Sequence, residues 1–246
     1  MASEVTSLRG KSGGSWPKVY LLGNSITQFS FSAEGGWGSL IADHLQRKCD
    51  VVCRGFSGYN SRWWKIILPK VLTASDVKDA ALITLFLGAN DSVLADLGKA
   101  QHVPLEEFQQ NMSDIVIYLQ SIGVAREKII IISPPACAEE KWRKECEEKG
   151  RIFSKCNKQT GEYAQACANV AKLHGTGYVH LYTEMMKVPD WDCMLNDGLH
   201  LSADGASFVF KLLKPLIDNL TCALPMRFPD WKDIDNKNPH AVLDQL

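Results

Sequence analysis

Short apolar runs alternate with amphipathic stretches along most of this chain. Five runs have the length of a β-strand, and they cover residues 19–22, 50–53, 81–87, 128–133 and 178–182. The third run is almost continuously apolar, which is typical of a central parallel strand covered on both faces. Helical patterns cover residues 35–45, 62–71, 104–123, 138–149, 161–173 and 203–220. This alternation predicts an α/β protein, a three-layer α/β/α sandwich around a mostly parallel five-stranded sheet.

The two ends of the chain lack this pattern. Residues 1–16 are polar and glycine-rich, so we expect a flexible N-terminal arm. Residues 17–220 then form one domain, and residues 221–246 form a C-terminal surface extension that folds back through Phe228 and Trp231. Inside the domain, Pro69 is expected to kink or end the helix over residues 62–71.

Composition narrows the class of protein. With 246 residues, 46% of them hydrophobic, the chain can bury a sizeable core. Its 27 basic and 28 acidic residues are interspersed and leave a net charge of −1, which argues against a nucleic-acid partner. No apolar run approaches the roughly 18 residues that a membrane-spanning helix needs, and residues 1–15 lack the apolar core of a secretory signal. These features predict a soluble, cytoplasmic protein without a membrane span.

The cysteines and histidines give no sign of a metal site. The eight cysteines are irregularly spaced and form no C-x-x-C pair, and ligand-like spacing is also absent among His102, His174, His180 and His240. Reduced thiols therefore explain the cysteines better than a zinc site or a disulfide framework. We expect neither a metal nor another cofactor.

Four loops carry residues that acyl-transfer chemistry can use. The first, second and third predicted strands are followed by Ser25, Gly58 and Asn90, and a late loop holds Asp197 and His200. In open α/β sheets, ligands bind outside the carboxyl ends of the strands. The sequence therefore predicts a site at that edge of the sheet.

The residue types suggest distinct roles. A serine alcohol is a weak nucleophile until a base takes its proton, so His200 is the expected base for Ser25, and Asp197 would orient the imidazole. The tetrahedral intermediate carries an oxyanion, which needs donors fixed in advance. The backbone N–H groups of Ser25 and Gly58 and the side-chain amide of Asn90 are the predicted oxyanion hole.

Each of these residues also has a purely structural interpretation. Ser25 suits a helix N-cap, and Asn90 with Asp91 suits an ordinary turn. Asp197 and Gly198 form a common turn pair, and His200 can satisfy a hydrogen bond in the core. Their joint occurrence in this order makes coincidence a poor explanation.

Two further features remain open to interpretation. Trp63 and Trp64 either line an acyl pocket or pack in the core, and packing is the more common role of such a pair. Asp91 and Asp197 suggest the paired carboxylates of a glycosidase, but a serine mechanism explains more of the residues.

The ordered motifs carry a resemblance to a known family. The chain resembles the SGNH hydrolases of the GDSL esterase/lipase superfamily in Gly23-Asn24-Ser25-Ile26-Thr27, in Gly58, in Gly88-Ala89-Asn90-Asp91 and in Asp197-Gly198-Leu199-His200. The stretches at residues 27–31, 35–38, 55–60 and 197–202 are similar to the isoamyl acetate-hydrolysing esterase homologues. The G-x-S-x-G elbow of classical α/β-hydrolases is absent.

This resemblance implies a flavodoxin-like fold and a metal-independent serine esterase that acts on small-molecule, short-chain esters. It also leaves room for a homodimer. By the same resemblance, Ser25, Asp197 and His200 match the catalytic triad, and Gly58 and Asn90 match the oxyanion-hole residues.

One residue departs from the family pattern. The family usually has aspartate before the nucleophile, and this chain has Asn24. Asparagine keeps an acceptor oxygen but loses the negative charge. Three hypotheses follow: a short-chain carboxylesterase that works through an acyl-enzyme, a deacylase or lysophospholipase of the same superfamily, and a catalytically weakened binding or regulatory protein.

Overall fold

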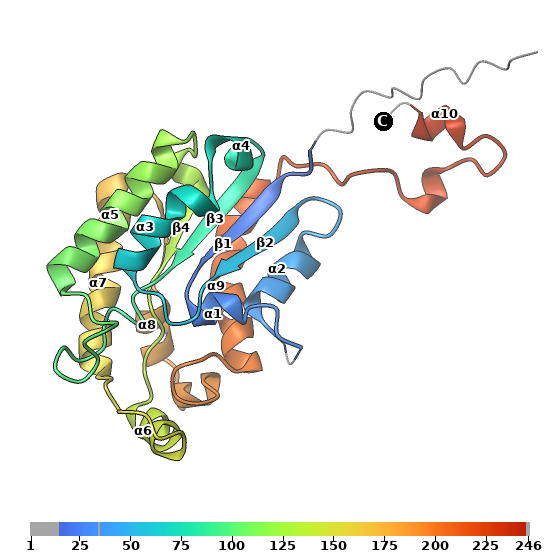
Figure 1. Cartoon of the computed structure of the whole chain (residues 1–246). Coiled ribbons are helices and arrows are strands. Elements are labelled where there is room, and N and C mark those ends of the chain that lie inside the picture. The colour runs from blue at the N-terminus through green and yellow to red at the C-terminus, as the bar shows by residue number, and fades with distance from the viewer. Residues whose placement is uncertain (1–14, 34, 245–246) are drawn as a thin grey trace, which may run out of the picture.

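A five-stranded parallel sheet forms the centre of the protein (Figure 1). The structure is a computed structural model that describes residues 15–33 and 35–244. Within these residues the strands lie in the order β2-β1-β3-β4-β5, and their bounds are Lys18–Gly23 (β1), Asp50–Gly55 (β2), Ala80–Phe86 (β3), Ile129–Ile132 (β4) and Gly177–Val179 (β5). Leu21 pairs with Cys53 on one side and with Thr84 on the other. The predicted five-stranded sheet is therefore confirmed.

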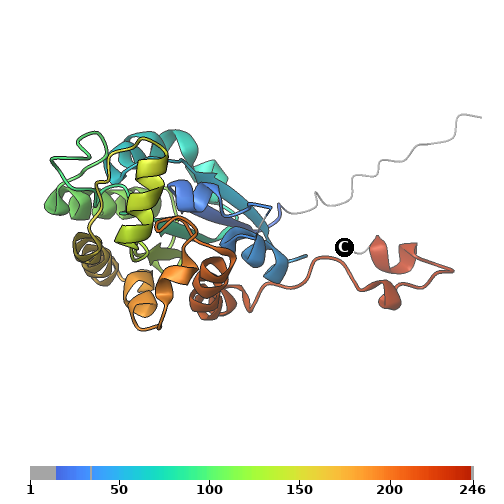
Figure 2. The same cartoon turned by 90° about the horizontal axis from the view of Figure 1, so that it is seen from below.

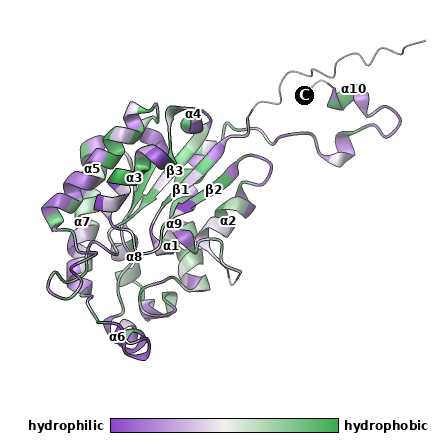
Figure 3. Ribbon diagram, viewed as in Figure 1, coloured by the Kyte–Doolittle hydropathy of each residue, from purple (hydrophilic) through white to green (hydrophobic). Residues whose placement is uncertain are grey.

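Helices join the strands and cover both faces of the sheet. The α-helices are Ser25–Gln28 (α1), Trp37–His44 (α2), Ser61–Val71 (α3), Ala74–Val77 (α4), Leu105–Ser121 (α5), Glu139–Glu148 (α6), Asn157–His174 (α7), Leu181–Met186 (α8), Ala203–Thr221 (α9) and His240–Leu243 (α10). Short 3₁₀ turns occupy Arg126–Lys128 (η1), Trp191–Met194 (η2) and Trp231–Asp233 (η3). Helix α6 is largely hydrophilic, in keeping with its charged sequence (Figure 3).

The sheet separates two hydrophobic clusters because successive side chains of a strand point to opposite faces. Leu21 of β1 belongs to the cluster that packs against α2 and α9, where Ile41 and Val209 are fully buried. Leu22 belongs to the cluster that packs against α3, α5 and α7, where Phe108 is fully buried. Figure 2 shows these helices on the two sides of the sheet. This arrangement is the predicted three-layer α/β/α sandwich.

One local prediction is wrong and another is tested only in part. The fifth strand was expected over residues 178–182, but β5 ends at Val179 and Leu181 begins α8. Its backbone leaves the ladder because the Tyr182 N–H donates to Ser133 Oγ (3.1 Å) and not to β4. Helix α3 continues past Pro69 and ends at Val71, so the proline lies within the last turn and does not end the helix at its own position. The alternative expectation, a kink at Pro69, stays a prediction.

The C-terminal extension does not fold back through its aromatic rings. Phe228 and Trp231 are 58% and 75% exposed. Contact with the domain comes instead from the Arg47 guanidinium, which donates to the carbonyls of Arg227 (3.1 Å) and Pro229 (2.9 Å). Beyond this point the segment with α10 extends away from the sheet (Figure 1).

The division into arm, domain and extension stays a prediction. Residues 1–14 of the expected N-terminal arm lie outside the described residues. All eight cysteines are free thiols. In the described ranges, no helix has both the length and the apolar character to cross a membrane, and no cluster of three or more His, Cys, Asp or Glu side chains is suited to hold a metal.

Candidate active site

The predicted site residues come together at the carboxyl edge of the sheet. Ser25 is the first residue of α1, directly after β1, and Asn90 lies in the loop after β3. Gly58 follows β2, which is the other neighbour of β1. Asp197 and His200 lie between η2 and α9. Residues 175 positions apart in the chain therefore meet across this edge.

His200 lies between Ser25 and Asp197. Its Nε2 atom is 2.9 Å from Ser25 Oγ, and its Nδ1 atom is 2.6 Å from Asp197 Oδ2. Because a carboxylate can only accept, Nδ1 carries the proton, and Nε2 is left to accept the Ser25 hydroxyl proton. This geometry is that of a nucleophile, a base and a group that orients the base.

The Asp197 carboxylate is held at both oxygens. Its Oδ1 atom accepts hydrogen bonds from the backbone N–H groups of Leu199 (2.9 Å) and His200 (2.7 Å). Burial by itself would raise the pKa of this carboxyl, but the hydrogen bond and charge of His200, together with the backbone bonds, lower it below its usual value. Asp197 is therefore ionised at neutral pH and favours a protonated imidazole.

Packing fixes the position of the imidazole ring. The rings of Phe29 and Trp142 contact His200 edge to face, with centroid distances of 6.1 Å and 6.0 Å. The loop comes close to the start of α6 at Gly198, where φ is +93°. A Cβ atom at this position would lie 2.5 Å from the backbone nitrogen of Trp142. Only glycine fits this position.

The three expected oxyanion donors face one cavity. The Ser25 and Gly58 amides donate to no protein acceptor within the described residues. Asn90 Nδ2 donates one hydrogen to the Tyr59 carbonyl (2.8 Å), which leaves its second hydrogen free. Gly58 has a φ of +81°, and its carbonyl accepts a hydrogen bond from Gln101 Nε2 (2.9 Å). These contacts hold the loops after β2 and β3 in a fixed relation.

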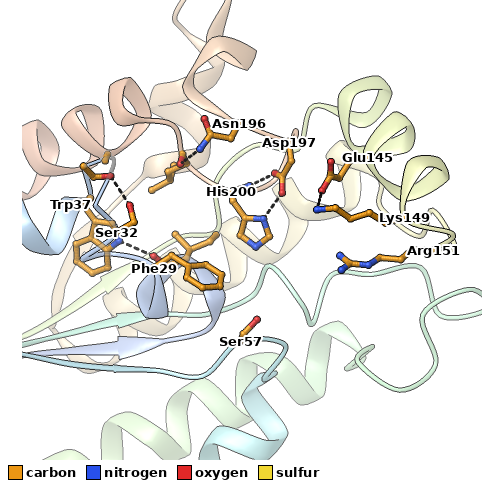
Figure 4. A pocket seen from close by; sticks show the side chains of 15 residues that line it. Phe29, Ser32, Trp37, Ser57, Glu145, Lys149, Arg151, Asn196, Asp197 and His200 are labelled. Carbon is orange, nitrogen blue, oxygen red and sulfur yellow. Dashed lines mark hydrogen bonds and ion pairs between the residues drawn. The ribbon is translucent and has the colours of Figure 1, made fainter.

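Two adjoining cavities meet at His200. The serine pocket, of about 400 Å³, is lined by Ser25, Gly58 and Asn90 among others. The second, the outer pocket, of about 450 Å³, is lined by Phe29, Trp37 and Asp197 among others. Figure 4 shows the outer pocket, with Arg151 and Ser57 below the His200 ring. Ser57, Arg151 and His200 line both cavities, so an extended ester has room on either side of the imidazole.

The structure tests two of the purely structural interpretations, the N-cap role of Ser25 and the packing role of Trp64. Ser25 is not the N-cap of α1: Asn24 is, and its Oδ1 atom accepts from the Ile26 N–H (3.1 Å). Trp64 is fully buried and donates to the Gly23 carbonyl (2.8 Å), so packing is its role.

Asp91 does not pair with Asp197. It is buried and accepts from the Ser61 N–H (2.7 Å). Burial raises its pKa to about 6, against the opposing effect of the Ser61 hydrogen bonds. Asp91 follows Asn90 in the loop after β3, and its hydrogen bond with Ser61 reaches the start of α3. It therefore connects the loops after β2 and β3.

Sequence reasoning missed two cationic residues of the serine pocket. Lys155 is buried, and its ammonium donates a hydrogen bond to the Ala89 carbonyl. Arg151 comes after α6. Neither residue belongs to a recognisable motif, and both reach the site only because the segment after α6 returns past the loop after β3. The isolated position of Lys155 in the stretch 152–156 is the one signal present in the sequence.

Comparison with known proteins defines the class of the protein. A family model of GDSL-like lipases/acylhydrolases matches residues 19–213. The chain belongs to this family, and it is a carboxylic ester hydrolase.

Particular relatives agree with this class. The isoamyl acetate-hydrolyzing esterase 1 homolog of Rattus norvegicus is 48% identical over 230 residues, which cover 93% of this chain and 92% of the relative. A lipase/acylhydrolase from Enterococcus faecalis superimposes with a TM-score of 0.67 at 20% identity, covering 86% of this chain and 99% of its own. A catalytic mutant of an acetylxylan esterase from Geobacillus stearothermophilus gives 0.63 at 19% identity, covering 88% and 99%. At these identities the two structures show a shared fold.

Proposed function

We propose that the protein is a serine esterase that hydrolyses short-chain, acetyl-type esters through Ser25, His200 and Asp197. The observation that carries this proposal is the position of His200, hydrogen-bonded to Ser25 at one ring nitrogen and to Asp197 at the other. The preference for short acyl chains is supported by relatives at 44–49% identity that are named for isoamyl acetate hydrolysis.

The first half of the reaction makes an acyl-enzyme. His200 Nε2 takes the proton of the Ser25 hydroxyl as Oγ attacks the ester carbonyl carbon. The carbonyl oxygen becomes an oxyanion, which the Ser25 and Gly58 N–H groups and Asn90 Nδ2 stabilise. When the intermediate collapses, the protonated His200 gives its proton to the departing alcohol, and the acyl group stays on Ser25.

Water completes the cycle. His200 removes a proton from water, which attacks the acyl carbon, and the same three donors hold the second oxyanion. The imidazolium then returns its proton to Ser25 Oγ as the acid leaves. Asp197 stabilises the imidazolium in both halves of the reaction without itself taking a proton.

Asn24 is compatible with this chemistry. It keeps the cap of α1 through Oδ1, so the turn that presents Ser25 is intact. Its Nδ2 atom is buried and has no protein partner within the described residues. Asparagine at this position therefore leaves one buried donor unpaired, and it keeps the cap that supports the nucleophile.

The test is hydrolysis of p-nitrophenyl acetate, butyrate and palmitate by wild type, Ser25→Ala and the control Ser121→Ala, whose serine lies on the exposed end of α5. We expect wild type and Ser121→Ala to cleave acetate and butyrate faster than palmitate, and Ser25→Ala to be inactive. A fluorophosphonate probe should label wild type and Ser121→Ala, and it should not label Ser25→Ala. Folded wild type that neither hydrolyses these esters nor reacts with the probe would support the binding or regulatory hypothesis instead.

A further inference from the structure

Among the described residues, the serine pocket is lined by basic residues and by no acidic residue. Arg151, Lys155 and His200 line it, with Cys146 as a further thiol, and no aspartate or glutamate does. A purely apolar acyl group gains nothing from such a wall. A cavity that is lined by two cations, Arg151 and Lys155, and by no carboxylate attracts negative charge.

Arg151 is available to a ligand. Its backbone N–H donates to the Cys146 carbonyl (2.7 Å), which fixes where the side chain starts. No ion pair or hydrogen bond engages its guanidinium within the described part of the chain. Its neighbour Lys149, in contrast, pairs with Glu145. Figure 4 shows the Arg151 guanidinium pointing toward the His200 ring. Both residues line both cavities.

Lys155 adds a second, fixed positive charge deeper in the pocket. Its side chain is buried and bonded to the carbonyl of Ala89, the residue before Asn90. Burial lowers the pKa of this ammonium to about 8, so it is protonated at neutral pH. Asp91 is a carboxylate with an electrostatic effect on Lys155, but it accepts from the Ser61 N–H and does not line the pocket.

We infer that the esters for which this site is built carry an anionic group, a carboxylate or phosphate, which pairs with the Arg151 guanidinium. This inference rests on the proposed function and names its substrate class. The planar guanidinium presents parallel N–H donors that match carboxylate and phosphate oxygens. Arg151 borders both cavities, so the anionic group belongs either to the acyl part or to the alcohol part of the ester.

Two matched ester pairs separate these sources. For the acyl part, p-nitrophenyl hydrogen adipate is compared with methyl p-nitrophenyl adipate, so that only the distal carboxylate differs. For the alcohol part, 4-acetoxybenzoate is compared with methyl 4-acetoxybenzoate. The enzymes are wild type, Arg151→Gln, Arg151→Glu and the control Arg126→Gln, which removes an equal charge at the opposite, amino end of β4. Ser25→Ala provides the rate that does not depend on the nucleophile.

The measured quantity is the ratio of kcat/KM for the anionic ester to that for its neutral partner. We expect Arg151→Gln to lower this ratio about tenfold in at least one pair, because a charge-assisted hydrogen bond from an exposed guanidinium is lost. Arg151→Glu should lower it further, and Arg126→Gln should leave it unchanged. In wild type the ratio should fall as NaCl is raised.

Two results would overturn the inference in distinguishable ways. If Ser25-dependent hydrolysis of the neutral esters is clear but both ratios are the same in wild type and Arg151→Gln, the anionic substrate class is wrong and the esterase proposal stands. If no ester of either pair is hydrolysed in a Ser25-dependent manner by folded protein, the proposed function itself fails.

Discussion

Exchanging Asp197 for asparagine tests the proposed roles at the level of single protons. The two backbone N–H groups of Leu199 and His200 both point at Oδ1. In Asp197→Asn this position must be filled by the amide oxygen, because an NH₂ group there would face two donors. The amide nitrogen then takes the place of Oδ2, 2.6 Å from His200 Nδ1.

This exchange forces the wrong tautomer on the histidine. Nδ1 must now accept from the new amide, so the imidazole proton moves to Nε2, which can no longer accept the Ser25 hydroxyl proton. In serine proteases the equivalent change lowers kcat about 10⁴-fold. That factor corresponds to about 5 kcal/mol of lost transition-state stabilisation.

The assay is steady-state hydrolysis of p-nitrophenyl acetate at pH 7, with folding checked by circular dichroism. Asp192→Asn, an exposed residue of η2 in the same region, is the matched control and should behave as wild type. A folded Asp197→Asn enzyme that keeps kcat within tenfold of wild type would refute the assigned role of Asp197 and the tautomer argument with it.

Three further predictions follow from buried or strained groups near the site. Lys155 has a folded-state pKa of about 8 against its ordinary 10.5, so between these pH values the unfolded chain binds more protons and the free energy of unfolding rises with pH. In urea denaturation from pH 8 to 10.5, the free energy of unfolding of wild type should rise by about 3 kcal/mol relative to that of Lys155→Met. Asn24→Asp, which keeps the acceptor that caps α1, should retain kcat within about threefold, whereas Asn24→Ala should lower the free energy of unfolding by about 1 kcal/mol. Gly58→Ala should lower kcat at least about tenfold, because φ at +81° disfavours alanine by about 1–2 kcal/mol and the relaxing backbone turns the N–H away from the oxyanion.

Each of these predictions has its own contrary result, and the glycine exchange also has a matched control. For Lys155, a difference in unfolding free energy that stays flat from pH 8 to 10.5 would contradict the buried ammonium. For Asn24, loss of activity in the aspartate variant would show that a negative charge at this position impairs the nucleophile even though the cap of α1 is kept. For Gly58, the control is Gly123→Ala, which has a φ of +101° and an open surrounding, and so imposes a similar strain away from the site. Equal kcat in the two glycine variants would rule out an oxyanion role for the Gly58 amide.

Local pattern was sufficient for most of the fold. The apolar runs predicted the strands because a parallel strand covered on both faces must be apolar nearly throughout. The prediction of residues 178–182 as one strand was wrong for a related reason: the apolar run continues into α8, and periodicity alone does not separate a short buried strand from a buried helix. The Tyr182 N–H bond to Ser133 decides the boundary, and that contact joins residues 49 positions apart.

The chain by itself determined how strands and helices follow one another along the sequence, because short-range periodicity is a property of neighbours in sequence. Residue chemistry is equally local, so the chain also determined the motif residues, which are Ser25, Gly58, Asn90, Asp197 and His200. Tertiary structure alone decided that His200 lies 2.9 Å from Ser25, and that Phe29 and Trp142 fix its ring. It also decided that Arg151 and Lys155 supply the positive charge of the serine pocket. These residues belong to different elements, and their charge and packing act through distance in space, which only the folded sheet and its returning loops establish.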